Sequence, residues 1–230
     1  TAEKEGIHAE NADDEETGYI YIADGDFTIT SDGDGMDASN IVQIEDGTFD
    51  ITAGGGAANS QKTHESDMPG GGMSQNIERP DGESMPRMGE KPDGENMPQD
   101  TTTDESGTST KGIKAGGGMY LNGGTYQIDS ADDSIHSNAN ITIADGTYTL
   151  ATGDDGVHAD DALTVNGGTI TVTESYEGLE GLTVTINDGT IDITASDDGI
   201  NTAGEKMELN GGYIHILAGG DGVDSNGDLT

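Results

Sequence analysis

The sequence predicts an all-β fold, a right-handed parallel β-helix of about seven to eight coils with about 22 residues in each coil. Three observations support this prediction. The segment Gly-Val-His-Ala at residues 156–159 recurs eight times with variations, short stretches of alternating apolar and polar residues follow the copies, and Asn-Gly or Asp-Gly steps separate these stretches. In such a solenoid, residues one period apart lie one strand spacing apart, about 4.8 Å.

A small residue opens each copy of the segment and sets the period. These anchor residues are Gly6, Gly35, Gly112, Ser134, Gly156, Gly178, Gly199 and Gly222. From Gly112 onward they are 21 to 23 residues apart, whereas 29 residues separate the first two and 77 separate Gly35 from Gly112. The long gap predicts an insertion between two coils.

Each coil is predicted to contain three short strands, and the coil that begins at Gly156 is an example. The first strand, at residues 156–159, follows an Asp-Asp-Gly turn. The second, at residues 163–165, ends at the Asn-Gly-Gly turn of residues 166–168, and the third, at residues 169–173, closes the coil. Period-two alternation indicates half-buried strands, and Asn, Asp and Gly accept the positive φ that tight turns need. We expect a right-handed winding, as for nearly all crossovers between parallel strands.

Four sets of apolar residues recur at fixed positions of the coil and are predicted to point inward and stack along the axis. One set lies in the first strands: Ile7, Met36, Ile113, Ile135, Val157, Leu179, Ile200 and Val223. Another lies in the third strands: Phe27, Phe49, Tyr126, Tyr148, Ile170, Ile191 and Ile214. We expect these aromatic side chains to pack in the core rather than to bind sugars. Because Trp is absent, the sequence predicts no strong sugar-stacking platform.

The chain is expected to be one domain in three parts. Residues 1–54 form coils 1–2, residues 55–110 form an insertion loop, and residues 111–230 form coils 3–8. The insertion contains all five prolines and five of the eight methionines, and it has no apolar period. This composition predicts an extended loop rather than further coils.

The net charge of -38, from 46 acidic residues against 8 Lys and Arg, limits the partners of this protein. Nucleic acid and anionic membranes would be repelled, and no apolar run approaches the roughly 20 residues that cross a bilayer. Disulfides are excluded because there is no cysteine. Both ends of the sequence lie inside repeats, which suggests a mature or excised fragment, so the lack of a visible signal peptide does not argue against export. Cations are the partners that the charge favours.

Acidic residues recur beside the anchors. The residue before the anchor is acidic in seven of eight copies, and stacking would place such carboxylates about 5 Å apart. At that distance two carboxylates repel by roughly 3 kcal/mol at an effective dielectric constant of about 20. Calcium would relieve the repulsion, because it accepts about six to eight oxygen ligands in irregular geometry. The predicted calcium ligands are Asp132, Asp133, Asp154, Asp155, Glu177, Glu180, Asp197, Asp198, Asp221 and Asp224. The alternative is that these acids are solvated turn residues that bind no ion.

Two lysines and two histidines fall in the same columns. Lys111 takes the otherwise acidic position before its anchor, and Lys114 lies in the outward column two residues after the anchor, next to His136 and His158. These four residues are the predicted contacts to an acidic sugar. The simpler interpretation is that the lysines neutralise neighbouring acids and that the histidines are polar surface residues.

Three blocks of the sequence resemble one bacterial family: Asp-Asp-Gly-Val-His-Ala at residues 154–159, Glu-Ser-Tyr-Glu-Gly-Leu-Glu at residues 174–180, and Ala-Ser-Asp-Asp-Gly-Ile-Asn at residues 195–201. It is the family of carbohydrate-binding domain proteins with a right-handed parallel β-helix, similar in fold to pectate lyases, and the resemblance covers nearly the whole chain. It implies a secreted or cell-surface location in bacteria, bound calcium, and binding of a plant-wall polysaccharide such as cellulose or acidic pectin. The acidic turn residues that it implies are Asp154, Asp155, Glu177, Glu180, Asp197 and Asp198.

The expected function is therefore calcium-dependent binding of a polysaccharide without turnover. One alternative is a polysaccharide lyase acting on uronates, which needs a base. The only arginines, Arg79 and Arg87, lie in the insertion, so Lys111, Lys114 and His136 are the candidates for that base, and we regard binding as favoured over catalysis. A second alternative is a structural or adhesive stalk whose coils associate end to end through unpaired strand edges.

Overall fold

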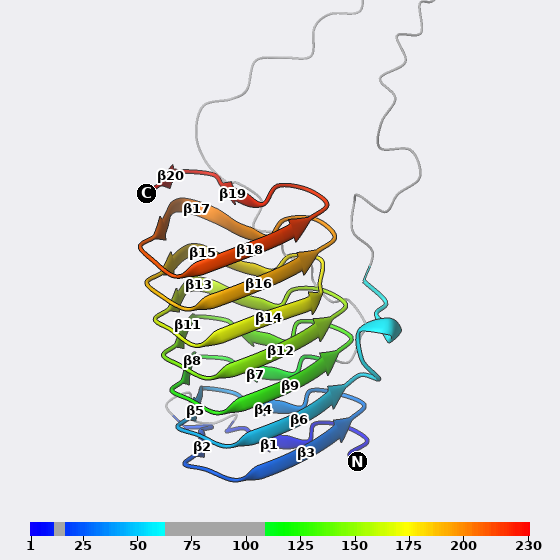
Figure 1. The fold of residues 1–230 in the computed structure, drawn as a ribbon. Coiled ribbons are helices and arrows are strands. Elements are labelled where there is room, and N and C mark those ends of the chain that lie inside the picture. The colour runs from blue at the N-terminus through cyan, green and yellow to red at the C-terminus, as the bar shows by residue number, and fades with distance from the viewer. Residues whose placement is uncertain (12–16, 63–108) are drawn as a thin grey trace, which may run out of the picture. The chain divides into compact units, whose positions relative to one another are not determined.

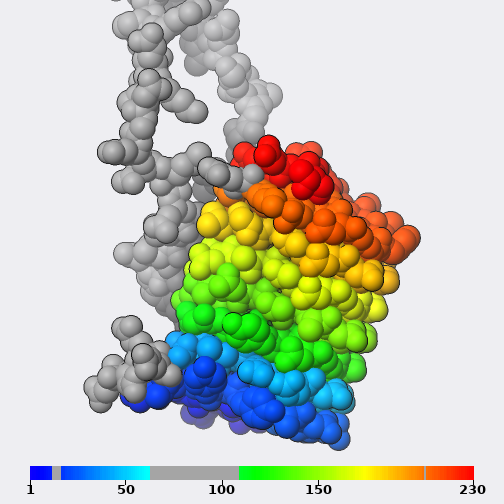
Figure 2. Space-filling model, turned by 90° about the vertical axis from the view of Figure 1, so that its left-hand side faces the viewer, coloured from blue at the N-terminus to red at the C-terminus, as the bar shows by residue number. Residues whose placement is uncertain are grey.

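The computed structural model describes residues 1–11, 17–62 and 109–230, which wind into one stack of coils with the N-terminal coil at the bottom and the C-terminal coil at the top (Figure 1). In that view the front strands run from left to right and the chain returns behind them before rising to the next coil, so the winding is right-handed. The stack has about seven coils of about 22 residues. The coils form successive bands of colour on the face shown in Figure 2. The predicted right-handed parallel β-helix is confirmed.

Three columns of parallel strands build the stack. The first column contains β1 (Ile7–Ala9), β4 (Met36–Ala38), β7 (Ile113–Ala115), β10 (Ile135–Ser137), the first parts of β13 (Val157–Val165), β15 (Leu179–Ile186) and β17 (Ile200–Leu209), and β19 (Val223–Ser225). The second contains β2 (Ile20–Ile22), β5 (Ile41–Ile44), β8 (Gly118–Leu121), β11 (Asn140–Ile143), the second parts of β13, β15 and β17, and β20 (Asp228–Leu229). The third contains β3 (Asp26–Ser31), β6 (Thr48–Ala53), β9 (Thr125–Ser130), β12 (Thr147–Thr152), β14 (Thr169–Glu174), β16 (Thr190–Ala195) and β18 (Tyr213–Ala218).

From β13 onward the first two strands of a coil merge, although the sequence predicts three separate strands. In the coil before, β10 and β11 are separate, and the amide of Ala139 between them donates a hydrogen bond to Ser137 Oγ (3.2 Å). In the next coil Ala159 pairs with Ser137, and β13 continues through a bulge between Ala159 and Ala162.

The core contains the aromatic column that the sequence predicts. Phe27, Phe49, Tyr126 and Tyr148 stack face to face, with ring centroids 5.1, 4.8 and 4.6 Å apart in turn. The last three are about 1% exposed. The buried phenols are satisfied, because Tyr126 donates to the carbonyl of Gly123 (2.8 Å) and Tyr148 to that of Asp145 (2.9 Å). The prediction that these rings belong to the core is confirmed.

The glycine anchors are required by the close approach of neighbouring coils. A Cβ on Gly178 would lie 2.3 Å from the carbonyl oxygen of Gly199 and 2.5 Å from Ile193 Cγ2. The φ of Gly178 is not in the left-handed region, so the constraint is space and not backbone conformation. Gly222 is the equivalent anchor in the last coil, and a Cβ there meets nothing within 4 Å.

Gly178→Ala is therefore expected to lower the free energy of unfolding by about 1–3 kcal/mol, because the methyl group overpacks the interior. Urea unfolding midpoints would measure the change. Gly222→Ala makes the same chemical change in open space and should leave the midpoint nearly unchanged. Equal midpoints for the two variants would contradict this explanation of the repeat.

The start of the predicted insertion packs along the side of the coils. Residues 55–62 include the 3-10 helix η1 (Ala57–Asn59), whose Ala57 amide donates to Asp129 Oδ1 (2.7 Å) in the following coil. Ser60 Oγ then reaches the carbonyl of Gly153 (3.3 Å), one coil further on. Residues 63–108, most of the predicted loop, lie outside the described residues. Among the described residues η1 is the one helix, so no helix there is long enough to cross a membrane.

Candidate functional site

The acidic turns lie between the third strand of one coil and the first strand of the next. The strand register aligns the outward residues two positions after each anchor into one column, as the sequence predicts. That column is His8, Asp37, Lys114, His136, His158, Glu180, Asn201 and Asp224. The predicted ligands are thus brought together coil by coil along one side of the stack.

The acid before the anchor has, in four coils, a structural role that sequence reasoning missed. Asp133 Oδ1 accepts a hydrogen bond from the amide of Asp155 (3.1 Å), and Asp155 Oδ1 accepts one from the amide of Glu177 (3.1 Å). Asp34 and Asp198 do the same for the next coils. The backbone carbonyls at these positions also accept amides, as when Ser134 N–H donates to the carbonyl of Asp155 (3.0 Å). Any ion would therefore depend mainly on the second oxygen of each carboxylate.

Three predicted calcium ligands form a cluster with two lysines, here called the lysine-bridged cluster: Asp132, Asp133, Asp154, Lys62 and Lys111. Lys111 Nζ lies 2.7 Å from Asp132 Oδ2 and 2.9 Å from Asp133 Oδ2. Lys62 Nζ lies 3.1 Å from Asp132 Oδ1 and 2.8 Å from Asp154 Oδ2. Sequence reasoning missed Lys62, because it belongs to the insertion and has no counterpart in the repeat. Two ammonium groups thus offset most of the charge of three carboxylates.

The electrostatics of the lysine-bridged cluster follow from burial and charge together. Burial opposes ionisation of Asp133, but Lys111 and then His136 outweigh it and hold the pKa of Asp133 well below its ordinary value. Burial also opposes the charge of Lys111, yet Asp133 and Asp132 raise the pKa of Lys111. Asp154 differs, because burial and the charge of Asp155 raise its pKa to about 8. The cluster therefore contains a fixed ion pair and one carboxyl group that readily takes a proton.

The next coil carries a cluster of histidine and carboxylates. His158 Nδ1 lies 3.3 Å from Asp155 Oδ2 and 3.4 Å from Glu180 Oε2. Burial disfavours the charged imidazole, but Asp155, Asp133 and Glu180 raise the pKa of His158 to about 10. Burial and the charge of Asp155 raise the pKa of Glu180 to about 9. His136 Nδ1 lies 2.9 Å from Asp133 Oδ2 in the coil before.

The last predicted ligands lie further up the stack. Both carboxylate oxygens of Glu177 accept hydrogen bonds from Asn201 Nδ2, at 3.1 and 3.0 Å, and burial together with Asp155 raises the pKa of Glu177 to about 7. Four more acids follow, of which none pairs with a lysine or arginine in the part of the chain that the structure describes. They are Asp197, Asp198, Asp221 and Asp224.

Three sets of side chains have metal-binding groups within 4.8 Å of one another: Asp132, Asp133 and Asp154; Asp133, His136 and His158; and Asp155, His158 and Glu180. The first set is already bridged by lysines. Calcium prefers oxygen to imidazole nitrogen, so the best match for calcium is Asp155 with Glu180 and the adjacent Glu177. No lysine or arginine of the described coils pairs with these three carboxylates, and the pKa values of both glutamates are raised.

Lys114, the remaining predicted sugar contact, lies between two acids. Its Nζ is 3.7 Å from Asp34 Oδ2 and 3.8 Å from Asp37 Oδ1. Both predicted lysines thus neutralise neighbours, which is the simpler of the two interpretations of the sequence, and Lys111 is only 13% exposed.

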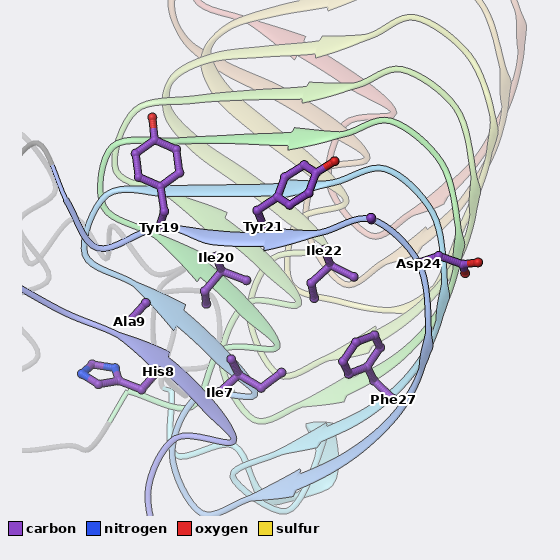
Figure 3. Close-up of a pocket in the computed structure, with 10 residues that line it drawn as sticks. Ile7, His8, Ala9, Tyr19, Ile20, Tyr21, Ile22, Asp24 and Phe27 are labelled. Carbon is purple, nitrogen blue, oxygen red and sulfur yellow. The ribbon is translucent and has the colours of Figure 1, made fainter.

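The N-terminal coil carries a hollow of about 470 Å³ (Figure 3). Its inner wall is apolar and includes Ile7, Ile22 and Phe27, whose side chains point into the hollow. Tyr19 and Tyr21 point the other way, to the outside of β2. The hollow is the inner space of the first coil, and it contributes no cluster of charged groups.

A family model described as "Carbohydrate-binding domain-containing protein" matches residues 1–156 and again residues 154–230. The two matches together cover the whole sequence. Searches of curated proteins and of solved structures found no match.

Proposed function

Because the chain belongs to the family of carbohydrate-binding domain-containing proteins, we propose that it is a secreted or cell-surface bacterial protein that binds a plant-wall polysaccharide, with calcium held in its acidic turns and without turnover. Family membership supports the binding of glycans. The calcium requirement and the identity of the glycan go beyond what family membership supports.

One observation carries the calcium proposal: Asp155, Glu177 and Glu180 are partly or fully buried on neighbouring coils, and no described lysine or arginine pairs with them. The pKa values of both glutamates are raised although the His158 imidazolium lies beside Asp155 and Glu180, so this one positive charge does not offset all three carboxylates. A calcium ion bound there would offset the negative charge of these carboxylates. It would also accept further oxygen ligands from a sugar.

The net charge decides how an acidic glycan would bind. A polyuronate and a protein of charge -38 repel each other, so we propose that bridging through calcium makes acidic pectin a ligand, whereas cellulose needs no bridge. The absence of turnover is supported by Lys111, because Asp133 and Asp132 raise its pKa against the effect of burial and so favour the ammonium form over a free base.

Asp155→Asn and Glu180→Gln are each expected to weaken calcium binding at least about tenfold, because the number of charged ligands sets calcium affinity. Isothermal titration of chelator-treated protein with calcium would measure this. Asp192→Asn is the matched control, because Asp192 is an exposed acid paired with His215 on the other sheet. The calcium proposal fails if the titration heats of the two site variants equal those of the unsubstituted protein.

Pull-down with insoluble cellulose and immobilised polygalacturonate, each with calcium or with EDTA, would test the ligand. Binding of polygalacturonate that EDTA removes is the expected result. A lyase would release unsaturated uronates, which absorb in the ultraviolet. An increase in this absorbance would show turnover and contradict the proposal of binding alone.

A further inference from the structure

Three tyrosines that the core does not use lie on the outward face of β2 and β8. Tyr19, Tyr21 and Tyr120 are 53%, 60% and 43% exposed. Figure 3 shows the rings of Tyr19 and Tyr21 on one side of β2, opposite Ile20 and Ile22. Exposure of three large aromatic side chains within three successive coils is unexpected in a chain with only 4% aromatic residues.

The register places these rings in a regular array. Tyr21 pairs with Gln43 and Gln43 pairs with Tyr120, so the two tyrosines occupy one outward column two coils apart, about 9.6 Å along the axis. Tyr19 lies directly before β2, two residues before Tyr21 and about 6.6 Å from it along an extended chain. Tyr120 leans back over its own strand, since a Cβ on Gly118 would lie 4.0 Å from Tyr120 Cε2.

Polar groups border the rings. Glu45 accepts hydrogen bonds from Gln43 Nε2 (2.5 Å) and from Asn122 Nδ2 (3.0 Å), which fixes both amides beside the tyrosines. Beyond Tyr120 the column continues with half-buried threonines: Thr142, Thr164 and Thr185. The surface is therefore a strip of aromatic rings followed by hydroxyl groups, parallel to the axis of the stack.

This chemistry suits an uncharged sugar polymer. A pyranose presents an apolar C–H face that packs on an aromatic ring and a rim of hydroxyl groups that bond to amides and carboxylates. Two rings in one column, separated by two strand spacings, can contact alternate sugars of an extended chain that runs along the axis. A polyuronate would instead bring its carboxylates to a surface whose fixed charge is Glu45 and would be repelled.

We infer that the outward face of β2, β5 and β8, with Tyr19, Tyr21 and Tyr120 as stacking groups and Gln43 and Asn122 beside them, binds an extended chain of uncharged pyranoses without calcium. The inference rests on the proposed glycan binding and assigns it a second surface, separate from the acidic turns. In this arrangement the acidic turns bind acidic glycans. The outward face of β2, β5 and β8, here called the tyrosine face, binds neutral glycans.

The test is the adsorption isotherm of the full chain on insoluble cellulose in EDTA, compared for the unsubstituted protein and Tyr21→Ala/Tyr120→Ala. The double substitution should weaken adsorption at least about tenfold, because aromatic anchors dominate such interfaces. Tyr21→Phe/Tyr120→Phe keeps the rings and should retain most of the binding. Tyr213→Ala is the matched control, since Tyr213 is 64% exposed on the opposite sheet.

The outcomes separate the two proposals. Undiminished adsorption of the double alanine variant, or equal loss in Tyr213→Ala, overturns the tyrosine face and leaves the proposed function intact. Binding of polygalacturonate but not of cellulose by the unsubstituted protein also overturns it. If the unsubstituted protein adsorbs to neither polymer, with or without calcium, the proposed function fails and the inference with it. Melting temperatures equal to that of the unsubstituted protein would show that the variants are folded.

Discussion

Replacing Lys111 with methionine is expected to lower the free energy of unfolding by about 3 kcal/mol, because the buried carboxylate of Asp133 loses its lysine partner and keeps only His136 beside it. The ammonium group lies 2.7 Å from Asp132 Oδ2 and 2.9 Å from Asp133 Oδ2, and the Asp133 side chain is only 2% exposed. Methionine has a similar length and removes the charge without opening a large cavity. Urea unfolding at pH 7 would measure the change.

Lys206→Met is the control for this substitution. Lys206 Nζ lies 2.8 Å from Glu208 Oε1, but the lysine is 53% exposed, so its loss should cost less than about 1 kcal/mol. Asp133→Asn in the Lys111→Met background should recover part of the lost stability, because Asn removes the unpaired charge and keeps an oxygen for the amide of Asp155. A Lys111→Met variant as stable as Lys206→Met would show that the lysine-bridged cluster does not stabilise the fold.

The same cluster joins the two ends of the insertion. Lys62 precedes residues 63–108 and Lys111 follows them, and both ammonium groups contact Asp132. The acidic turns of this part of the stack therefore have an internal counter-charge, whereas Asp155, Glu177 and Glu180 have none from a described lysine or arginine. This difference along one column is the reason that we place calcium in the upper coils.

The period and the alternation of the sequence predict nearly all of the fold. Each residue of the first-strand ladder pairs as the spacing requires, from Ile7 with Met36 to Ile200 with Val223. The turn acids are neighbours for the same reason, because position in a solenoid follows directly from position in the repeat. The bulges of β13 and β17 were not predicted, because extra residues at one corner of a coil do not change the alternation within its strands.

The parts of the candidate site that the sequence did not predict lie outside the repeat or depend on atoms rather than residues. Lys62 is in the insertion, so no spacing relates it to Asp132 and Asp154. The side-chain rotamer decides which oxygen of a carboxylate accepts a backbone amide and which oxygen remains available to an ion. The sequence does not predict this rotamer. Tyr21 and Tyr120 are separated in the sequence by the insertion, which conceals that they share a column.

Chelator-treated protein is expected to lose stability as the pH rises from about 5 to 9. Burial and the charge of Asp155 raise the pKa of Glu177 to about 7, whereas the pKa in the unfolded chain is about 4.3. Between these values the folded state binds more protons than the unfolded state, so stability falls as pH rises and is fully present only below about 4.3. Glu177 alone would contribute roughly 3–4 kcal/mol.

Other groups set the limits of this pH window. Asp154 and Glu180, with pKa values raised to about 8 and about 9, extend the loss of stability upward, and His158, raised to about 10, acts in the same direction above its ordinary value of 6.5. Asp133 has the opposite sign, because its pKa is held low by Lys111, so its contribution is lost as pH falls below its ordinary value of 3.8. Greatest stability without metal should therefore lie near pH 4, between the ordinary pKa values of Asp133 and Glu177.

Melting temperatures in EDTA at pH 5, 7 and 9 would test this prediction, with Glu177→Gln as the diagnostic variant. Gln is neutral at every pH, so Glu177→Gln should be more stable than the unsubstituted protein at pH 8 and nearly equal to it at pH 5. Calcium should act in the same window, because it competes with the protons that the glutamates hold: it should raise the melting temperature strongly at pH 8 and weakly at pH 5. A melting temperature independent of pH between 5 and 9 would mean that Asp155, Glu177 and Glu180 ionise without cost, and the reason for a cation among them would be lost.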